Sequence, residues 1–271
     1  MEKIKELIRS RRSVRTFDGR EVREEDLQKL SSFMSEIENP YGIPVEFKLL
    51  DVKKEGLSSP VVSGENLYVG AKVQHMPHME EAFGFSFEML VLYAQSLGIG
   101  TVWIGGTMKR SLFERAMQLS QDERMPCVSP LGYPAEKMSL REGMMRKAVG
   151  ADKRKPFEKL FSNGAYDVPL TEENAGRLAE PLTMVQWAPS AVNKQPWRVV
   201  AGKDAVHFYL KRDKGFISEA TGDLQKIDMG IALCHFALTA EEEGWNVSLY
   251  TDDPAIAVPS DVEYIATYRI S

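Results

Sequence analysis

Three short segments of the chain carry side chains suited to binding a small ligand, and the first is Arg11-Arg12-Ser13-Val14-Arg15. It places three guanidinium groups and one hydroxyl directly after an expected helix. A guanidinium is planar and binds phosphate oxygens in pairs, and a serine hydroxyl adds a further donor. The segment therefore suggests an anion site, although its spacing alone is more typical of a solvated basic turn.

The other two segments are rich in glycine and in neutral polar groups. Trp103-Ile104-Gly105-Gly106 ends in two glycines, which let a backbone approach a flat ligand or simply form a turn. The segment 188–197, Ala-Pro-Ser-Ala-Val-Asn-Lys-Gln-Pro-Trp, supplies a hydroxyl and two amides between two prolines. A loop with an Asx-turn is the simpler alternative, but the density of polar groups favours a loop that binds the edge of a heteroaromatic ring.

Residue patterns of other catalytic classes are missing from the sequence. His75 and His78 are spaced like metal ligands, but the chain has only four histidines and no cysteine or acidic pattern to complete a set. We therefore predict no metal site, and we expect His235 to be a hydrogen-bonded core or interface residue. The sequence has no Gly-x-Ser-x-Gly, P-loop or Gly-x-Gly-x-x-Gly motif, which argues against hydrolase, NTPase and Rossmann dehydrogenase functions.

Composition excludes further classes of protein. The 271 residues carry a formal net charge of −5 and no basic block, so we expect no nucleic-acid partner. The segment Met1-Glu2-Lys3 is charged, unlike the start of a signal peptide, and the longest apolar runs, such as 89–94, are too short to cross a membrane. Cys127 and Cys234 alone cannot build a disulfide framework. These features favour a cytoplasmic protein with no membrane partner.

Hydrophobic spacing and turn residues predict the elements that position the three segments. Two helices, about 80–97 and 227–243, are apolar on almost every face and stop at Gly98 and Gly244, so both should be buried. We expect residues 135–170 to form an extended connection with few apolar anchors. Further helices are predicted over about 1–9, from 24–26 onward, over 110–119 and from 171, and strands over 45–52, 67–69, 127–131, 197–201 and 206–210.

The second part of the chain repeats features of the first. Four positions of the first buried helix recur in the second at a constant offset of 146 residues (230 − 84), namely Gly84, Leu92, Ala94 and Gly98 against Gly230, Leu238, Ala240 and Gly244. Both parts also follow the order helix, strand preceded by proline, buried helix and glycine. We therefore predict a diverged internal duplication, with half-repeats of about 1–165 and 166–271 in a single unit.

Taken together, the three segments resemble the nitroreductase family of FMN-dependent oxidoreductases. The resemblance rests on Arg-Arg-Ser-x-Arg at 11–15, Trp-Ile-Gly-Gly at 103–106 and Ala-Pro-Ser-Ala-x-Asn-x-Gln-Pro-Trp at 188–197. Residues 131–136 and 153–158 are similar to that family's closing segments. The matches are specific in combination and weak singly. We predict an α+β fold with a mixed sheet and two central buried helices in two pseudo-symmetric halves.

The order of the segments departs from that family. There the Pro-Ser-x-x-Asn-x-Gln-Pro loop follows soon after Arg-Arg-Ser and reaches the flavin from the partner subunit of a homodimer. Here residues 31–46 lack the loop, which occurs only in the second half, and that half has no Arg-Arg-Ser segment and carries Leu249-Tyr250-Thr251-Asp252 in place of Trp-Ile-Gly-Gly. A fused pseudo-dimer that divides one site between its halves explains this order. We therefore expect one flavin per chain and a monomer.

The resemblance also implies roles for individual residues. Arg11, Arg12, Ser13 and Arg15 would hold the FMN phosphate and ribityl chain, and Arg154 would add charge there. Ile104, Gly105 and Gly106 would back the ring, with the Gly105 N–H facing the flavin N5. The pyrimidine edge would be lined from the other half by Pro189, Ser190, Ala191, Asn193 and Gln195.

The implied activity is ping-pong transfer of a hydride from NAD(P)H, through flavin N5, to a nitroaromatic, a quinone or a similar small-molecule acceptor. The cofactor supplies this chemistry, so no side chain is assigned as a catalytic proton donor. Two alternatives stay open from the sequence. One is a flavin enzyme specialised for another reaction, such as reductive dehalogenation or flavin fragmentation. The other is a protein that binds flavin or a metabolite as a sensor or partner module without turnover.

Overall fold

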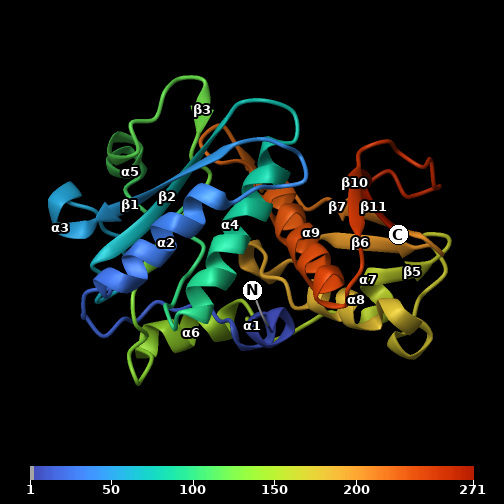
Figure 1. The fold of residues 1–271 in the computed structure, drawn as a ribbon, viewed down its shortest axis with the longest axis horizontal. Helices are drawn as coiled ribbons and strands as arrows, with labels where there is room; N and C mark the ends of the chain where they lie inside the picture. The colour runs from blue at the N-terminus through green and yellow to red at the C-terminus, as the bar shows by residue number, and fades with distance from the viewer. Residues whose placement is uncertain (1–2) are drawn as a thin grey trace.

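The computed structural model describes residues 3–271, in which two β-sheets lie on either side of a pair of long helices (Figure 1). In the first sheet, β2 pairs in antiparallel fashion with β1, β3 and β4: β1 (Val45–Asp51), β2 (Leu67–Gln74), β3 (Glu123–Arg124) and β4 (Val128–Leu131). The second sheet has the order β10 (Val247–Tyr250), β11 (Val262–Ile270), β7 (Ala205–Lys211), β6 (Trp197–Ala201) and β5 (Phe161–Asn163). Its β5–β6 pair is parallel and the rest antiparallel. The α+β class is confirmed, with two sheets in place of one.

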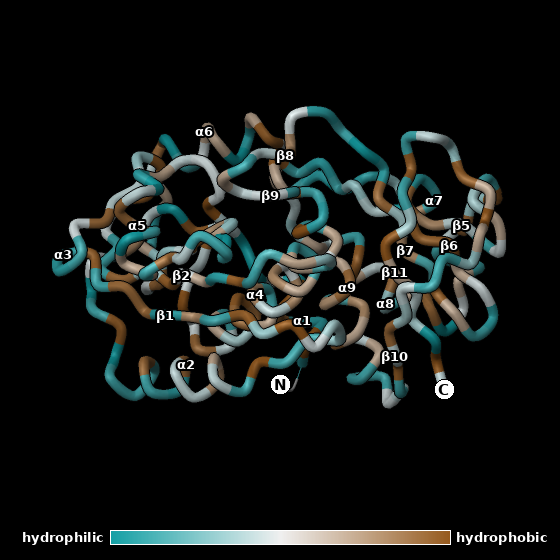
Figure 2. The backbone as a smooth tube through the Cα atoms, turned by 90° about the horizontal axis from the view of Figure 1, so that it is seen from above, coloured by the Kyte–Doolittle hydropathy of each residue, from teal (hydrophilic) through white to brown (hydrophobic). Residues whose placement is uncertain are grey.

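The helices lie between the sheets and around them (Figures 1 and 2). They are α1 (Ile4–Ser10), α2 (Glu24–Glu36), α3 (Val52–Glu55), α4 (Met79–Ser96), α5 (Arg110–Ala116), α6 (Leu140–Ala148), α7 (Phe157–Leu160), α8 (Ala179–Gln186) and α9 (Leu224–Glu242). Short 3₁₀ turns occur at Glu172–Asn174, Gly176–Leu178 and Ala191–Asn193, and a small hairpin joins β8 (Ile217–Ser218) to β9 (Gly222–Asp223). In Figure 2, α2, α3 and α5 accompany the first sheet, and α7 and α8 accompany the second.

The two central helices, α4 and α9, cross at a pair of glycines. A Cβ atom on Gly84 would lie 2.1 Å from the carbonyl oxygen of Ile227, and one on Gly230 would lie 2.1 Å from that of Glu81. Both distances are far below van der Waals contact, so only glycine lets the two backbones come this close. The contacts are reciprocal, because each glycine meets the residue three positions before the other.

Both central helices also end in the same way, at the predicted glycines. Gly98 has φ 73° and Gly244 has φ 80°, the left-handed conformation that glycine adopts without strain. The next residue donates its N–H to a carbonyl five positions earlier, from Ile99 to Ala94 and from Trp245 to Ala240, each at 2.9 Å. These are the hydrogen bonds of a Schellman motif. The predicted burial of the two helices and their glycine stops are confirmed.

Two regions differ from the sequence expectations. Residues 135–170, predicted as an extended connection, contain α6, α7 and β5, because the Ser139 hydroxyl caps α6 and buried Phe157 and Phe161 anchor the rest. The helix predicted from residue 171 begins instead with 3₁₀ turns, and regular helix starts only at Ala179. The first predicted helix is α1, which begins at Ile4, and the Met1 and Glu2 of that prediction lie outside the described residues.

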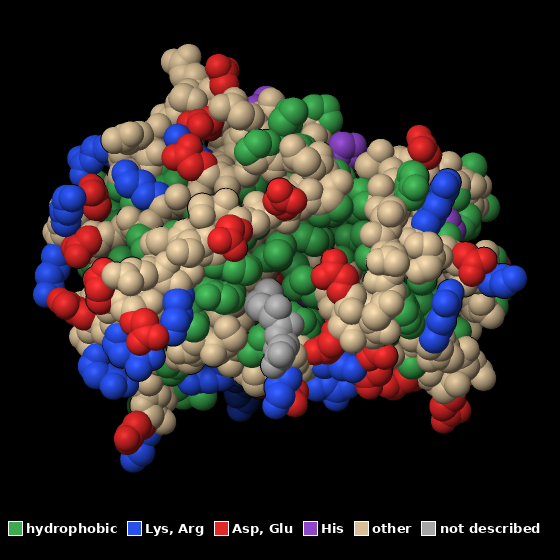
Figure 3. Space-filling view, in the orientation of Figure 1, with side chains coloured by type: hydrophobic (Ala, Val, Ile, Leu, Met, Phe, Trp, Pro, Cys, Tyr) green, Lys and Arg blue, Asp and Glu red, His purple; other side chains and the backbone are tan. Residues whose placement is uncertain are grey.

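Hydrophobic side chains gather at the centre of one face, over α4 and α9, with charged side chains around them (Figure 3). Within residues 3–271, no helix is both long and apolar enough to cross a membrane. The thiols of Cys127 and Cys234 are buried and free. Cys234 lies in α9, within the apolar core that the two central helices share.

Candidate functional site

The Arg11–Arg15 segment runs from the end of α1 alongside Thr101, whose carbonyl accepts from the Val14 N–H at 2.8 Å. The Arg11 side chain is 6% exposed, and its Nε and Nη1 have no hydrogen-bond partner in residues 3–271. The Glu88 carboxylate lies 3.9 Å from Nε, which is too long for a hydrogen bond. Burial lowers the pKa of Arg11, and Glu88 offsets part of that effect. A buried guanidinium with free N–H groups is costly unless an anion binds there.

Three further arginines share this feature, Arg15, Arg154 and, at the distant strand β3, Arg124. The Nε atoms of Arg15 and Arg154 are also buried and lack a partner within the described chain. Burial lowers the pKa of both guanidinium groups, and Arg11 lowers that of Arg154 further. The Arg154 guanidinium lies over the Trp187 ring at 5.1 Å and donates to the Trp187 carbonyl at 3.3 Å. Arg11, Arg15 and Arg154 (from here on the arginine cluster) therefore form a positively charged site with N–H groups left to donate.

Glu142 of α6 positions this segment and was missed by the sequence analysis. Its buried carboxylate accepts from Arg12 Nη1 at 3.1 Å, from the Arg15 N–H at 3.2 Å and from Thr16 Oγ1 at 2.8 Å. The Glu142 N–H donates to the Ser139 hydroxyl, as in a capping box. Ser-x-x-Glu at 139–142 was thus a signal that could have located α6. Arg12 is paired with Glu142 and has fewer donors left for a ligand.

The glycine segment is held by backbone pairing and by one arginine. Ile104 is buried and exchanges hydrogen bonds with Val128 at 2.9 and 3.0 Å. Arg110 donates to the carbonyl of Gly105 at 2.5 Å and to two carbonyls of the segment before β4. A Cβ on Gly105 would lie 3.4 Å from the nearest atom, and one on Gly106 would meet nothing within 4 Å. The protein's own packing does not require two glycines here, so the open backbone face fits a flat ligand.

A buried network joins the glycine segment to the arginine cluster across the two central helices. Glu88 of α4 accepts from the Trp103 indole N–H at 3.1 Å and lies 3.0 Å from His235 Nε2 of α9. His235 Nδ1 lies 2.9 Å from the Met184 carbonyl, and because that oxygen can only accept, Nδ1 carries a hydrogen. His235 is the hydrogen-bonded core residue that the sequence predicts.

The polar loop of residues 188–196 is strained. Val192 has φ 44°, Asn193 has φ 57° and Gln195 has φ 49°, all in the left-handed region that side chains other than glycine rarely adopt. Val192 is β-branched and 58% exposed, so packing does not explain its conformation. Such strain is concentrated at ligand-binding and catalytic sites.

The amides predicted to line a ring edge are bonded within the protein. Gln195 is 3% exposed, and its side-chain oxygen accepts from the Lys155 N–H at 2.8 Å. Asn193 Nδ2 donates to the Gly150 carbonyl at 2.7 Å, and its Oδ1 accepts from Gln195 Nε2 at 3.2 Å. Ser190 accepts from the Gln195 N–H at 2.8 Å and keeps its own hydroxyl hydrogen to donate. The loop is therefore tied to residues 150–155, next to Arg154.

The start of α9 touches both the loop and the glycine segment. Both oxygens of Asp228 accept from the Ala191 N–H, at 3.0 and 3.2 Å, and burial raises the pKa of that carboxyl. Leu224 Cδ2 lies 3.5 Å from the position of a Cβ on Gly105. Two predicted segments thus meet through α9, while Arg154 links the loop to the arginine cluster. In residues 3–271, no group of three or more His, Cys, Asp or Glu is placed to hold a metal ion.

Comparisons with known proteins place the chain in one family. The family model described as "Putative TM nitroreductase" matches residues 3–240. The chain is similar to the crystal structure of a putative nitroreductase from Thermotoga maritima, with 22% identity, a TM-score of 0.62 and coverage of 98% of this chain and 92% of that one. An FMN-dependent nitroreductase from Clostridium difficile has 17% identity and a TM-score of 0.42, covering 52% of this chain and 94% of its own. No curated protein matches the sequence.

Proposed function

Because the chain belongs to the family described as "Putative TM nitroreductase", we propose that it is an FMN-dependent oxidoreductase that transfers electrons from NAD(P)H to a small-molecule acceptor, such as a nitroaromatic or a quinone. The observation that carries the proposal is the arginine cluster. Arg11 has two N–H groups without a partner in the described chain, and Arg15 and Arg154 each have one. A phosphate has the charge and the oxygens to accept from all of them.

The residues of the first half would hold FMN at two places. Arg11, Arg15 and Arg154 would bind its phosphate, with Arg12 and Ser13 supporting the same end. Ile104, Gly105 and Gly106 would back the ring, because the backbone there is fixed by Arg110 and open toward a ligand. When bound, FMN supplies the acceptance of a hydride from NAD(P)H and its transfer to the acceptor.

The second half would contribute the polar loop. Ser190 has a hydroxyl hydrogen to donate, and Pro189 and Ala191 are partly exposed beside it. Asn193 and Gln195 would act mainly by fixing the shape of the loop, since their amide groups already bond to residues 150–155. No side chain is needed as a proton donor, so these residues bind and orient.

We also propose that the two halves arose by duplication and form one site in a monomer. The reciprocal contacts of Gly84 and Gly230 support this proposal, because a twofold relation between α4 and α9 produces such a pair. The matching hydrogen bonds at the two helix ends support it as well, since Ala94 and Ala240 accept them at the same offset of 146 residues (240 − 94). One FMN per chain is the expected stoichiometry.

The first experiment is the visible absorption spectrum of the purified protein, followed by counting released FMN per chain and measuring oxidation of NADH and NADPH with a quinone or a nitroaromatic. We expect flavin bands, one FMN per chain and acceptor-dependent oxidation. Arg154→Gln should weaken FMN binding about tenfold, whereas Lys153→Gln, at the exposed neighbouring position, should leave it unchanged.

Three outcomes would contradict parts of the proposal. A protein that stays colourless after incubation with FMN would contradict the proposal that FMN is the cofactor. Bound FMN without oxidation of either nucleotide, whatever the acceptor, would favour a sensor. Two FMN per chain, or an obligate dimer in sedimentation, would contradict the single divided site.

A further inference from the structure

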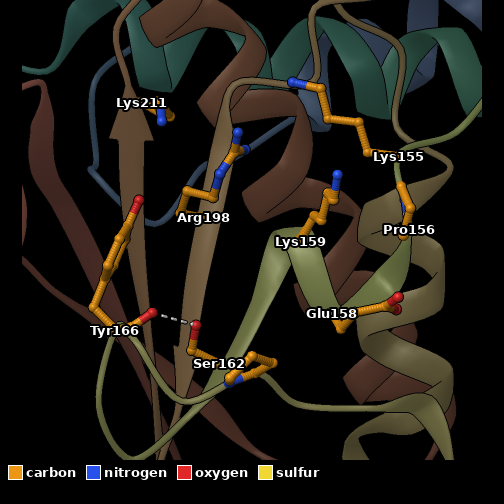
Figure 4. A pocket seen from close by; sticks show the side chains of 9 residues that line it. Lys155, Pro156, Glu158, Lys159, Ser162, Tyr166, Arg198 and Lys211 are labelled. Carbon is orange, nitrogen blue, oxygen red and sulfur yellow. Dashed lines mark hydrogen bonds between the residues drawn. The ribbon is translucent and has the colours of Figure 1, made fainter.

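A second basic pocket lies beside β5, β6 and β7, and its volume is about 490 Å³, within the range of small-molecule sites (Figure 4). Lys155, Lys159, Arg198 and Lys211 contribute four cations to its lining, and Glu158 contributes the one carboxylate. Figure 4 shows the nitrogen-bearing ends of the four cations in the upper part of the pocket, above Glu158. The pocket is thus strongly positive, in a chain whose formal net charge is −5.

The second sheet and the chain before it place these cations together. Arg198 lies on β6, and the Lys211 N–H, at the end of β7, donates to the Pro196 carbonyl at 2.9 Å. Residues 196 and 198 share one face of their strand, so Lys211 opposite residue 196 faces the same way as Arg198. Lys159 reaches the pocket from α7, and Lys155 lies just before that helix.

Most of this positive charge has no nearby carboxylate. Within the described chain, no carboxylate oxygen lies within 4 Å of Lys155, Lys159 or Arg198, and only Lys211 has one, from Asp261 at 3.8 Å. Lys155 Nζ donates to the Lys194 carbonyl at 2.6 Å, and Arg198 Nη1 donates to the carbonyls of Gln195 and Trp197. These neutral acceptors leave the charges uncompensated.

The pocket is separate from the arginine cluster although Arg154 and Lys155 are adjacent in the chain. Arg154 lies over Trp187 and donates to its carbonyl, whereas Lys155 Nζ donates to residues 194 and 195. The two neighbouring cations therefore have different partners, and only Lys155 lines the pocket.

We propose that this pocket binds a phosphate-bearing small molecule with at least two negative charges, at a site distinct from that of FMN. Arg198 supplies a planar fork for phosphate oxygens, and Lys155, Lys159 and Lys211 supply point charges around it. Tyr166 and two prolines form a less polar wall, on which the base of a nucleotide could stack. The ligand is then either an inorganic diphosphate or a nucleotide diphosphate.

The charge state of Lys155 gives the site a measurable signature. Burial, followed by the charges of Arg198, Lys194 and Lys211, lowers the pKa of Lys155 to about 8, and only Asp213 opposes them. A bound anion raises that pKa again, so binding near pH 8 takes up protons. Proton uptake makes the observed binding enthalpy depend on the ionisation enthalpy of the buffer. Lys155→Met should abolish this dependence.

The test is isothermal titration of the whole protein, saturated with FMN, with pyrophosphate and with ADP. We expect one site per chain, with affinity reduced about tenfold in Arg198→Gln and in Lys159→Gln. Glu158→Gln, which removes the lining carboxylate, should tighten binding, and Lys203→Gln, a matched loss of charge at an exposed position outside the pocket, should have no effect. If the natural ligand is a nucleotide, Tyr166→Leu lowers the affinity for ADP and leaves the affinity for pyrophosphate unchanged. If it is an inorganic diphosphate, Tyr166→Leu changes neither affinity.

Two results would overturn the proposal. One is the absence of binding by both ligands at millimolar concentration. The other is binding that Arg154→Gln abolishes and Arg198→Gln does not, because that pattern assigns the anion to the arginine cluster. Neither result depends on turnover. The proposal for the pocket can therefore be wrong while the proposed FMN chemistry is right, and the FMN chemistry can be wrong while the pocket binds its ligand.

Discussion

Replacing Arg11 with methionine separates ligand binding from structural support. Methionine keeps most of the side-chain volume and removes the guanidinium, whose Nε and Nη1 have no partner in residues 3–271. A charge-assisted hydrogen bond contributes about 1.5–3 kcal/mol. Two bonds from one group are not additive, so we expect a loss of about 2–4 kcal/mol, which corresponds to FMN binding about 30- to 1,000-fold weaker.

The same change should leave the FMN-free protein as stable as before or more stable. Burial lowers the pKa of Arg11, which means that folding opposes its charge, and the Glu88 carboxylate at 3.9 Å offsets only part of this cost. Glu88 keeps its bonds to Trp103 and His235 in the variant. The two readouts are quenching of flavin fluorescence on titration with apoprotein, and urea unfolding without FMN.

Arg9→Met is the matched control, because the Arg9 side chain is 48% exposed and, among residues 3–271, bonds only to Glu180 at the surface. It should change FMN affinity less than twofold. Affinity of Arg11→Met within threefold of wild type would refute the phosphate assignment. A loss of several kcal/mol of stability in the FMN-free variant would show instead that Arg11 is a structural residue.

Three further predictions concern stability, and urea unfolding checks each of them. Gly230→Ala should lower the free energy of unfolding by about 3 kcal/mol or more, because its Cβ would meet a backbone oxygen at 2.1 Å, whereas Gly143→Ala, open on α6, should raise it by about 0.5–1 kcal/mol. Equal effects would contradict the close crossing. Burial raises the pKa of Glu81 from 4.5 to about 7, so the stability linked to its protonated form is complete below pH 4.5 and lost as the pH rises through 7. The free energy of unfolding of Glu81→Gln should therefore rise relative to that of wild type across this pH range, by up to about 3 kcal/mol at pH 8. A difference between the two proteins that does not change with pH would contradict the raised pKa. Val192→Asn should raise stability by about 1 kcal/mol, since asparagine tolerates the left-handed backbone at this exposed position, and an unchanged midpoint would mean that the strain is absent.

The parts of the fold that the sequence predicts are those with a local cause. The helices α4 and α9 follow from their apolar spacing and from Gly98 and Gly244, which end them by local hydrogen bonds. The parallel pairing of β5 with β6, and the long strand β11, depend on contacts between distant residues. The register of these strands is set by packing across the sheet, and residues adjacent in the sequence do not indicate it.

The candidate site divides in the same way. The guanidiniums of residues 11–15, the two glycines and the two amides each lie within five residues of one another, so these residue types are visible in the sequence. Which guanidinium is buried is not visible, because that depends on Glu142 and Glu88, which approach the segment from α6 and α4. The strain at Val192 and the hydrogen bond from the Ala191 N–H to Asp228 cannot be predicted for the same reason. Asp228 lies on α9, and the apolar pattern of that helix indicates only that it is buried.

The close crossing of α4 and α9 also sets an order of events during synthesis. Gly230 follows Gly84 by 146 residues (230 − 84), and at about 5–20 residues per second the ribosome needs about 7 to 30 s to make that length of chain. Throughout this time α4, with Phe83, Phe85 and Phe87, has emerged without the helix that covers it. Nascent chains that end before α9 should therefore bind chaperones that hold apolar segments. In a single chain, the length of this exposure is fixed by the spacing of the two helices and does not depend on protein concentration.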